Sequence, residues 1–251
     1  MAIQIIPIQG LPIIKQDDDL AELTIQALAD MKLKPQEKDI FVYSHVIVSR
    51  SEGKIVDLEK VNPSKKALEY AEVTGKNPRL VEVILSESRA IRRIAPGVLI
   101  TETKHGFVCA NAGIDKSNIP GDTIVSPLPN EPDVSALRIR LRIKKLIGVD
   151  VGVIVCDTHG RAHREGEINV TVGASGFEVI RDRRGEFDLF GYELKVKRTT
   201  VADELASAAE LVIGQSDEGI PAALIRGYDV QLSDSSCAKD IVRAREKDLF
   251  L

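Results

Sequence analysis

The segment from Val151 to Gly166 places a dense group of polar side chains directly after an apolar run. The run Val151–Cys156 is rich in β-branched residues, which is typical of a strand buried on both faces. The polar side chains that follow it are Asp157, Thr158, His159, Arg161, His163, Arg164 and Glu165. Carboxylate and hydroxyl oxygens suit Mg²⁺ or Mn²⁺, and arginines suit phosphate or carboxylate groups. Taken locally, a solvated charged turn at the end of a strand is the commoner explanation.

Two further polar segments, each containing glycine, have a similar composition. In Cys109–Asn118, small residues allow close backbone approach, while Asn111, Asp115 and Asn118 supply oxygen atoms. The other segment is Gly214–Pro221. Read alone, such a segment is equally well explained as an Asx-turn loop. Three oxygen-rich segments with arginines nearby favour a divalent metal with a polyphosphate over thiol, haem or zinc chemistry.

The common catalytic and nucleotide-binding fingerprints are missing from the sequence. Neither the G-x-x-x-x-G-K-[ST] nor the G-x-G-x-x-G spacing occurs after a strand, and there is no G-x-S-x-G or H-E-x-x-H motif. His159 and His163 are four residues apart, the spacing of one helix face. Gly160 between them predicts a loop instead, so a zinc site is weakly supported.

Composition places the chain among globular proteins and excludes several binding classes. Its 251 residues are 43% hydrophobic and 29% charged, enough for a sizeable core. A net charge of −4 and the absence of tryptophan argue against duplex or single-stranded nucleic acid as a partner. Three widely spaced cysteines fit a reducing, cytoplasmic setting. The apolar Ala2–Ile14 lacks a basic leader, and no run reaches the length of a membrane span, so we expect neither a signal peptide nor a membrane partner.

Periodicity and turn residues predict an α+β fold with mixed and antiparallel sheets and flanking helices. We expect strands over Ala2–Ile8, Asp39–Ser49, Ala95–Thr103, Val151–Cys156, Glu167–Gly173, Tyr192–Thr199 and Ala222–Ile225. We expect helices over Leu20–Leu28, Asn62–Gly75, Arg79–Ser88, Ser135–Ile147, Val201–Val212 and Ala238–Phe250. Thr200 and Asp203 resemble a capping box, and Ala174–Gly176 is expected to be a turn.

Six short motifs, in this order and spacing, carry a family resemblance that runs from about Gly10 to about Gly227. They are Gly10-Leu11-Pro12, Ser49-Arg50-Ser51-Glu52-Gly53-Lys54, Asn111-Ala112-Gly113-Ile114-Asp115, Asp157-Thr158-His159-Gly160-Arg161, Val201-Ala202-Asp203-Glu204 and Asp217-Glu218-Gly219-Ile220-Pro221. Together they resemble the coenzyme F420-0:L-glutamate (γ-glutamyl) ligases of deazaflavin biosynthesis, in their stand-alone archaeal-type form. Each motif is modest alone, and their shared register makes the resemblance specific.

The resemblance implies GTP-dependent addition of L-glutamate to the carboxylate of F420-0, and then to F420-1 through a γ-linkage. The acceptor carboxylate would attack the γ-phosphate, and glutamate would displace phosphate from the resulting acyl phosphate, leaving an amide, GDP and phosphate. Such a phosphoryl transfer depends mainly on positioning and electrostatics. The resemblance also implies one ligase unit over residues 1–251, built from two interwoven, discontinuous subdomains, and a homodimer.

The resemblance further implies roles for matching residues. Asp115 and Asp157 would hold one divalent ion, Mg²⁺ or Mn²⁺, and Thr158 and Gln215 would help hold a second, with K⁺ as a further cation. The expected GTP contacts are Leu11, Pro12, Ile13, Ile14, Ser44, His45, Val46, Arg50, Asn118, Ile213, Gly214, Gln215, Ser216, Asp217, Glu218, Gly219 and Ile220. From charge and position, Arg161 and Arg164 are our candidates for binding the anionic deazaflavin or the γ-phosphate.

Two alternatives stay open at this point. One is a ligase of the same fold that acts on another carboxylate acceptor, which acceptor screening would distinguish. The other is a nucleotide- or metal-binding module without catalysis, which would bind nucleotide but not turn it over.

Overall fold

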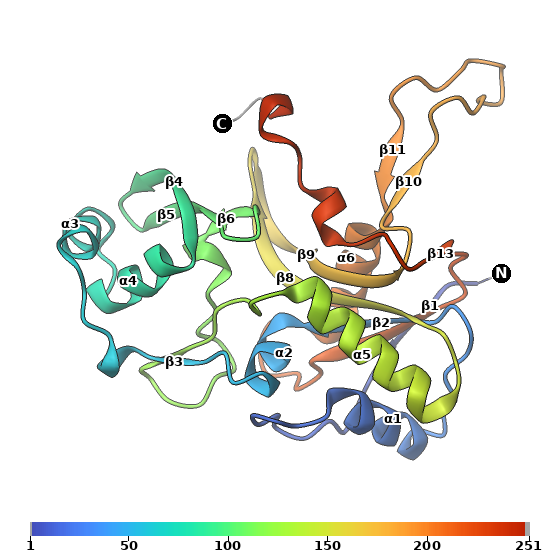
Figure 1. The fold of residues 1–251 in the computed structure, drawn as a ribbon, viewed down its shortest axis with the longest axis horizontal. Helices are drawn as coiled ribbons and strands as arrows, with labels where there is room; N and C mark the ends of the chain where they lie inside the picture. Colours follow the sequence, from blue (N-terminus) through green and yellow to red (C-terminus); the bar gives the residue numbers. More distant parts are fainter. Residues whose placement is uncertain (1, 249–251) are drawn as a thin grey trace.

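The computed structural model describes residues 2–248 and is organised around a six-stranded sheet with strand order β1-β12-β2-β8-β9-β13 (Figure 1). Its central pair, β2 and β8, is parallel, and the other neighbours are antiparallel. The strands are β1 (Gln4–Pro7), β2 (Ile40–Ser44), β8 (Gly152–Arg161), β9 (Arg164–Phe177), β12 (Ala222–Arg226) and β13 (Leu232–Ser233). The α+β class predicted from the sequence is therefore confirmed.

Helices cover both faces of this sheet, so its central strands are buried on two sides. Helices α1 (Leu20–Asp30) and α5 (Pro132–Ile147) share one core with Val153 and Val155 of β8. Helix α6 (Val201–Ile213) shares the other core with Ile154 and Cys156. Successive residues of a strand point to opposite faces, which explains why the run Val151–Cys156 is continuously apolar.

The segment between Glu52 and Glu131 builds a second, smaller layer, which Figure 1 shows to one side of the main sheet. Its core is formed by two helices and the three-stranded sheet β4-β5-β6. Helix α2 (His45–Ser51) precedes this layer and packs Ile47 and Val48 into the core of the main sheet. The elements of the layer are β3 (Val56–Asp57), α3 (Lys65–Thr74), α4 (Pro78–Ser86), β4 (Ser88–Ala95), β5 (Val98–Thr103), β6 (Val108–Ala110), β7 (Ile124–Val125) and 3₁₀ turns at Leu58–Lys60 and Asn111–Gly113. The two interwoven subdomains expected from the resemblance stay a prediction.

Strand β9 has an edge that β13 covers only at Gly176 and Phe177. Acidic side chains accept hydrogen bonds from three of the backbone N–H groups of β9. Those of Asn169, Thr171 and Ala174 donate to Glu210, Asp203 and Asp133, over 2.7, 2.9 and 2.8 Å. Carboxylates placed along an edge in this way prevent it from pairing with another strand.

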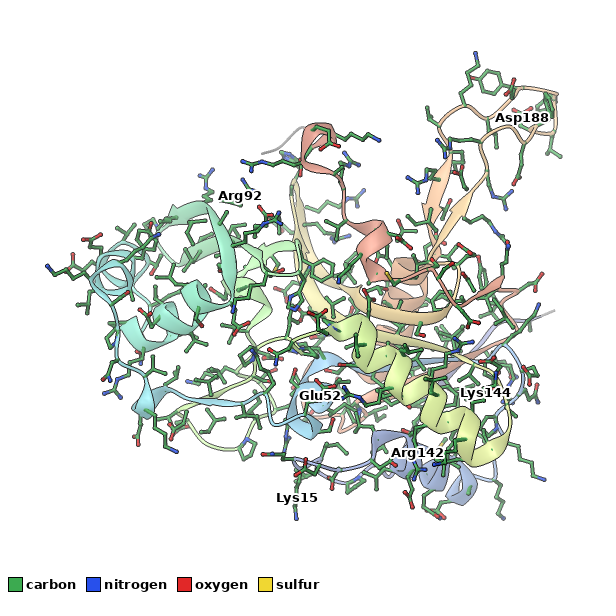
Figure 2. The ribbon with its side chains drawn as sticks, viewed as in Figure 1. Lys15, Glu52, Arg92, Arg142, Lys144 and Asp188 are labelled. Carbon is green, nitrogen blue, oxygen red and sulfur yellow. The ribbon has the colours of Figure 1, made fainter. Side chains whose placement is uncertain are left out.

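Two segments extend from the body of the molecule. The hairpin of β10 (Ile180–Asp182) and β11 (Arg198–Thr200) projects away from the sheet, with Asp188 at its tip (Figures 1 and 2). The C-terminal segment contains 3₁₀ turns at Ala238–Ile241 and Arg245–Lys247. No helix within residues 2–248 is long and apolar enough to cross a bilayer.

Several expected elements are wrong. The strand predicted over Asp39–Ser49 ends at Ser44, because the Ser44 hydroxyl accepts the N–H of Val46 and begins α2. The turn predicted at Ala174–Gly176 is strand, since β9 continues to Phe177. Asp203 does not cap α6 with Thr200; its carboxylate accepts the N–H of Thr171 instead.

The ends of three other elements also differ from prediction. Strand β8 continues through His159 to Arg161, because β9 pairs with it along this length, so His159 lies in a strand rather than a loop. Most of the strand predicted over Tyr192–Thr199 is irregular, and β11 begins only at Arg198. The final helix predicted over Ala238–Phe250 is replaced by the two 3₁₀ turns, and its last two residues lie outside the described range.

Candidate active site

A cavity of about 560 Å³ opens at the end of β2, where the main sheet meets the inserted layer. This volume lies within the usual range of small-molecule sites. Most of the site residues named from the sequence line it: Leu11, Pro12, Ile13, Ile14, Ser44, His45, Val46, Arg50, Asp115, Asn118, Asp157, Thr158, Ile213, Gly214, Gln215, Ser216, Glu218, Gly219 and Ile220. Segments far apart along the chain therefore converge on one space, although their individual roles stay predictions.

Asp157 lies in β8 and is held between two histidines. Its Oδ2 atom is 2.9 Å from Nε2 of His159, and its Oδ1 atom is 3.3 Å from Nε2 of His45. The second contact is electrostatic and does not meet hydrogen-bond geometry. Burial raises the pKa of Asp157, but the two histidines outweigh burial and hold that pKa well below its usual range. The carboxylate is therefore ionised at neutral pH.

Thr158 points to the opposite face of β8 and enters a network of oxygen atoms. Its hydroxyl lies 2.8 Å from Oδ1 of Asn169 and 3.1 Å from Oε1 of Gln215. The Gln215 amide donates over 2.6 Å to Glu210, whose other oxygen accepts the Asn169 N–H. The network fixes the side chain of Gln215, which follows the end of α6.

Asp115 enters the cavity from the inserted layer through a tightly folded turn. Asn111, Ala112 and Gly113 all have positive φ, of 53°, 57° and 66°. After this turn, backbone bonds of Asp115 with Ser126 fix the position of the carboxylate, which accepts the N–H of Ser117 over 2.6 Å. Non-glycine residues rarely adopt positive φ, and such strain gathers at functional sites.

Two loops that line the cavity contact each other. Asn118 donates from Nδ2 to the carbonyl of Ser216 over 3.0 Å, and its own carbonyl accepts from Arg50 over 3.4 Å. The loop after α6 is internally ordered, because the Glu218 carboxylate accepts the Ser216 N–H. The lining of the cavity thus combines residues from both layers of the molecule.

The charges of the cavity favour cations beside an anionic ligand. Its lining contains the carboxylates of Asp115, Asp157 and Glu218, whereas its basic side chains are Arg50 and His45. A triphosphate placed here would face more negative than positive charge unless metal ions neutralised it.

The donor atoms fit such ions. Carboxylate, hydroxyl and amide oxygens of Asp115, Asp157, Thr158 and Gln215 are the hard ligands that Mg²⁺ and Mn²⁺ take. Residues 2–248 contain no group of three or more His, Cys, Asp or Glu side chains arranged around a single metal position.

Three residues named from the sequence do not line this cavity. Arg161 and Arg164 face one another in register near the far end of the β8–β9 hairpin, and Asp217 lies outside the lining. Conversely, sequence reasoning missed Asn169, which is 3% exposed and lines the cavity. Its signal was a single amide in the apolar strand sequence Ile168–Val172.

The fold and the cavity define an α+β protein with an oxygen-rich ligand site, and comparison with known proteins gives its family. Residues 9–227 match the model of the family described as F420-0:Gamma-glutamyl ligase. The chain is 47% identical over 251 residues to a coenzyme F420:L-glutamate ligase of Methanothermobacter thermautotrophicus, covering 100% of this chain and 99% of the relative.

Two further relatives are also coenzyme F420:L-glutamate ligases. The ligase of Methanopyrus kandleri is 46% identical over 240 residues, 94% of this chain and 93% of the relative. That of Archaeoglobus fulgidus is 39% identical over 250 residues, 100% of this chain and 97% of the relative. The chain therefore belongs to the F420-0:gamma-glutamyl ligase family, and this membership makes it a ligase.

Proposed function

We propose that this protein is a GTP-dependent ligase that joins L-glutamate to the carboxylate of F420-0 and then, by γ-linkage, to F420-1. The observation that carries the proposal is the convergence of Asp115, Asp157, Thr158 and Gln215 on one cavity that Arg50 also lines. Mg²⁺ or Mn²⁺ held by these oxygens would neutralise the triphosphate and the charge that develops during phosphoryl transfer. K⁺ is a further proposed cation.

The reaction proceeds in two displacements. A carboxylate oxygen of the acceptor attacks the γ-phosphorus, the bond from that phosphorus to the β,γ-bridging oxygen breaks, and GDP leaves as the acyl phosphate forms. The glutamate amine then attacks the acyl carbon, inorganic phosphate leaves, and the nitrogen loses its proton to give the amide. Arg50 supplies fixed positive charge beside the phosphates, and the loops joined by Asn118 and Ser216 restrict water.

Mass spectrometry of the products tests this function. With GTP, L-glutamate, F420-0 and Mg²⁺ or Mn²⁺, the acceptor should gain one glutamyl residue and then a second, with one GDP released per addition. GTP turnover whose rate does not depend on L-glutamate or F420-0 would contradict the proposal. Activity with a different carboxylate acceptor would favour a ligase of the same fold that acts on that acceptor. Nucleotide binding without turnover would favour a nucleotide- or metal-binding module without catalysis.

The proposal includes a homodimer, and the projecting hairpin supports it. Large apolar side chains of this hairpin are almost fully exposed, at 98% for Leu189 and 95% for Phe190, which follow Asp188 at the tip, and at 87% for Val196, which lies closer to β11. An exposed apolar group of this kind favours a protein partner. Sedimentation analysis should give a dimer for the wild type and a monomer for Leu189→Asp/Phe190→Asp; a wild-type monomer would contradict the proposal.

A further inference from the structure

A second cavity, of about 300 Å³, lies on the other side of His159 from the first. It lies along the uncovered edge of β9, between β6 and the C-terminal segment. The two cavities adjoin at one side chain: His159 lines the second cavity, and its Nε2 atom is 2.9 Å from Asp157, which lines the first. A small molecule in the second cavity would therefore lie one side chain away from the proposed phosphoryl-transfer site.

The walls of this cavity carry charges of both signs from different elements. Arg243 and Arg245 approach from the C-terminal segment, and within residues 2–248 neither forms an ion pair. Arg89 also lines it, but its guanidinium pairs with Glu102, as does that of Arg92. The two C-terminal arginines thus keep donors for an anionic ligand.

The lining also contains a fixed carboxylate and a buried hydroxyl. Asp203, on α6, accepts the N–H of Thr171 over 2.9 Å with Oδ1, and its carboxylate also has an electrostatic contact with the Thr171 hydroxyl. The Thr171 hydroxyl is buried, since the residue is 2% exposed, and it has no partner with hydrogen-bond geometry among the described residues. A buried hydroxyl without a partner is costly, so a ligand that satisfies it gains affinity.

We propose that the second cavity is the subsite for the amino-acid substrate, L-glutamate. Asp203 and Thr171 receive its ammonium group, and Arg243 and Arg245 receive its carboxylates. This rests on the proposed function, because the site assignment takes glutamate as the co-substrate. The volume suits a small molecule, whereas the nucleotide-sized F420-0 would need a larger space. An acceptor with only anionic groups would also gain nothing from the Asp203 carboxylate.

Steady-state kinetics of the full chain, with each substrate varied in turn, test the subsite. Arg243→Gln/Arg245→Gln should raise the KM for L-glutamate by at least about tenfold, because two charge-assisted contacts are lost, and leave the KM for GTP and for F420-0 unchanged. Arg79→Gln is the matched control, because Arg79 is an exposed arginine of the inserted layer at the start of α4 and does not line the cavity.

Glutarate has both carboxylates of glutamate but no amine, so it distinguishes the contribution of Arg243 and Arg245 from that of Asp203. It should compete with L-glutamate in the wild type and lose its inhibition in the double arginine variant. Asp203→Asn keeps the oxygen that accepts the Thr171 N–H. It should raise the KM for L-glutamate by about tenfold while glutarate inhibits as strongly as before or more strongly.

An unchanged KM for L-glutamate in both variants would overturn the subsite, as would a rise confined to the KM for F420-0. If the wild type forms no product, the proposed function fails, and equilibrium dialysis with radiolabelled L-glutamate then decides the subsite. Retention of the label by wild type and Arg79→Gln, but not by the other two variants, supports it. Equal retention, or none in any of them, overturns it.

Discussion

His159 donates a hydrogen bond from Nε2 to Oδ2 of Asp157 over 2.9 Å, and both side chains are nearly buried. Burial lowers the pKa of His159, but the hydrogen bond and charge of Asp157 outweigh it and raise that pKa to about 10. The imidazole is therefore protonated at neutral pH and acts as the donor. An ionised carboxylate positioned in this way keeps lone pairs for a metal ion, because one oxygen can accept more than one contact.

Asp157→Asn should leave the fold intact and reduce kcat on the order of 10³-fold, because an amide keeps the shape but loses the charge that a metal ion requires. Thermal unfolding provides the control for folding. A variant that retains the full rate at limiting Mn²⁺ would show that Asp157 is not a metal ligand.

Asp115→Asn should behave in the same way, since both carboxylates line one cavity. The two substitutions together should reduce kcat by a much smaller factor than the product of their separate reductions, because the effects of groups that act as a unit are strongly non-additive. Multiplicative losses in the double variant would indicate that the two carboxylates act independently.

Most helices could be predicted from local signals, because each signal meets a requirement of the backbone at a helix end. Asp19 accepts the N–H of Glu22 at the start of α1, and Gly75 and Gly148 end α3 and α5 in the left-handed conformation. Helix α2 was missed because its residues from His45 to Arg50 are all buried, and an element buried all round has no helical or strand periodicity to read.

The site was predictable in its residue types but not in its full extent. The family resemblance pointed to Asp115, Asp157 and Gln215, and the fold brings them to one cavity. Asn169 was missed because its polar partner Thr158 lies on the neighbouring strand, and that register is set by tertiary pairing. The second cavity was missed because it depends on how Ile241–Asp248 packs against β9.

The salt-bridge cluster of α5 predicts acid sensitivity of the fold. Burial raises the pKa of Asp150, but hydrogen bonds from Lys144 and Arg140 outweigh it, and the net pKa is lowered. The stabilisation is therefore fully present above the unfolded-state pKa of about 3.9 and is lost as pH falls through the lower folded-state value. Figure 2 shows Lys144 on α5, toward the end from which the chain continues to Asp150.

Asp150→Asn should lower the free energy of unfolding at pH 7 by about 1–2 kcal/mol and flatten its decline between roughly pH 5 and pH 2. Urea unfolding at a series of pH values measures both effects. Asp122→Asn, at an exposed position without an ion pair among the described residues, is the control and should follow the wild type. Parallel pH profiles for all three proteins would rule out this contribution.

The hydroxyl of Thr158 should matter to activity more than its methyl group. Thr158→Val removes the donor to Asn169 and the contact with Gln215, so we expect kcat to fall on the order of 10²-fold and stability to fall by about 1 kcal/mol. Thr158→Ser keeps the hydroxyl and should restore most of the activity. Equal rates for the valine and serine variants would assign the role to side-chain shape instead.

Substitutions at Gly113 and Gly97 can distinguish the effect of backbone strain from the effect of displacing Asp157. An added Cβ would lie 2.9 Å from Oδ2 of Asp157 and 3.0 Å from the side chain of Leu128, and the φ of +66° already disfavours a side chain. Gly97 has a similar φ of +74° but open space around an added Cβ. The two glycines therefore carry the same conformational penalty, and Gly113 alone of the pair has a contact with the candidate site.

Gly97→Ala should cost about 1 kcal/mol of stability through strain and leave the Mn²⁺ dependence of activity unchanged. Gly113→Ala should cost about 2 kcal/mol or more and also raise the Mn²⁺ concentration needed for half-maximal rate, because Asp157 must shift away from the new methyl group. Titrating Mn²⁺ against activity in both variants, beside their thermal unfolding, distinguishes the effects. If Gly113→Ala lost stability but kept the wild-type Mn²⁺ dependence, the position of Asp157 next to this turn would not govern metal binding, and the strain of Asn111–Gly113 would be structural.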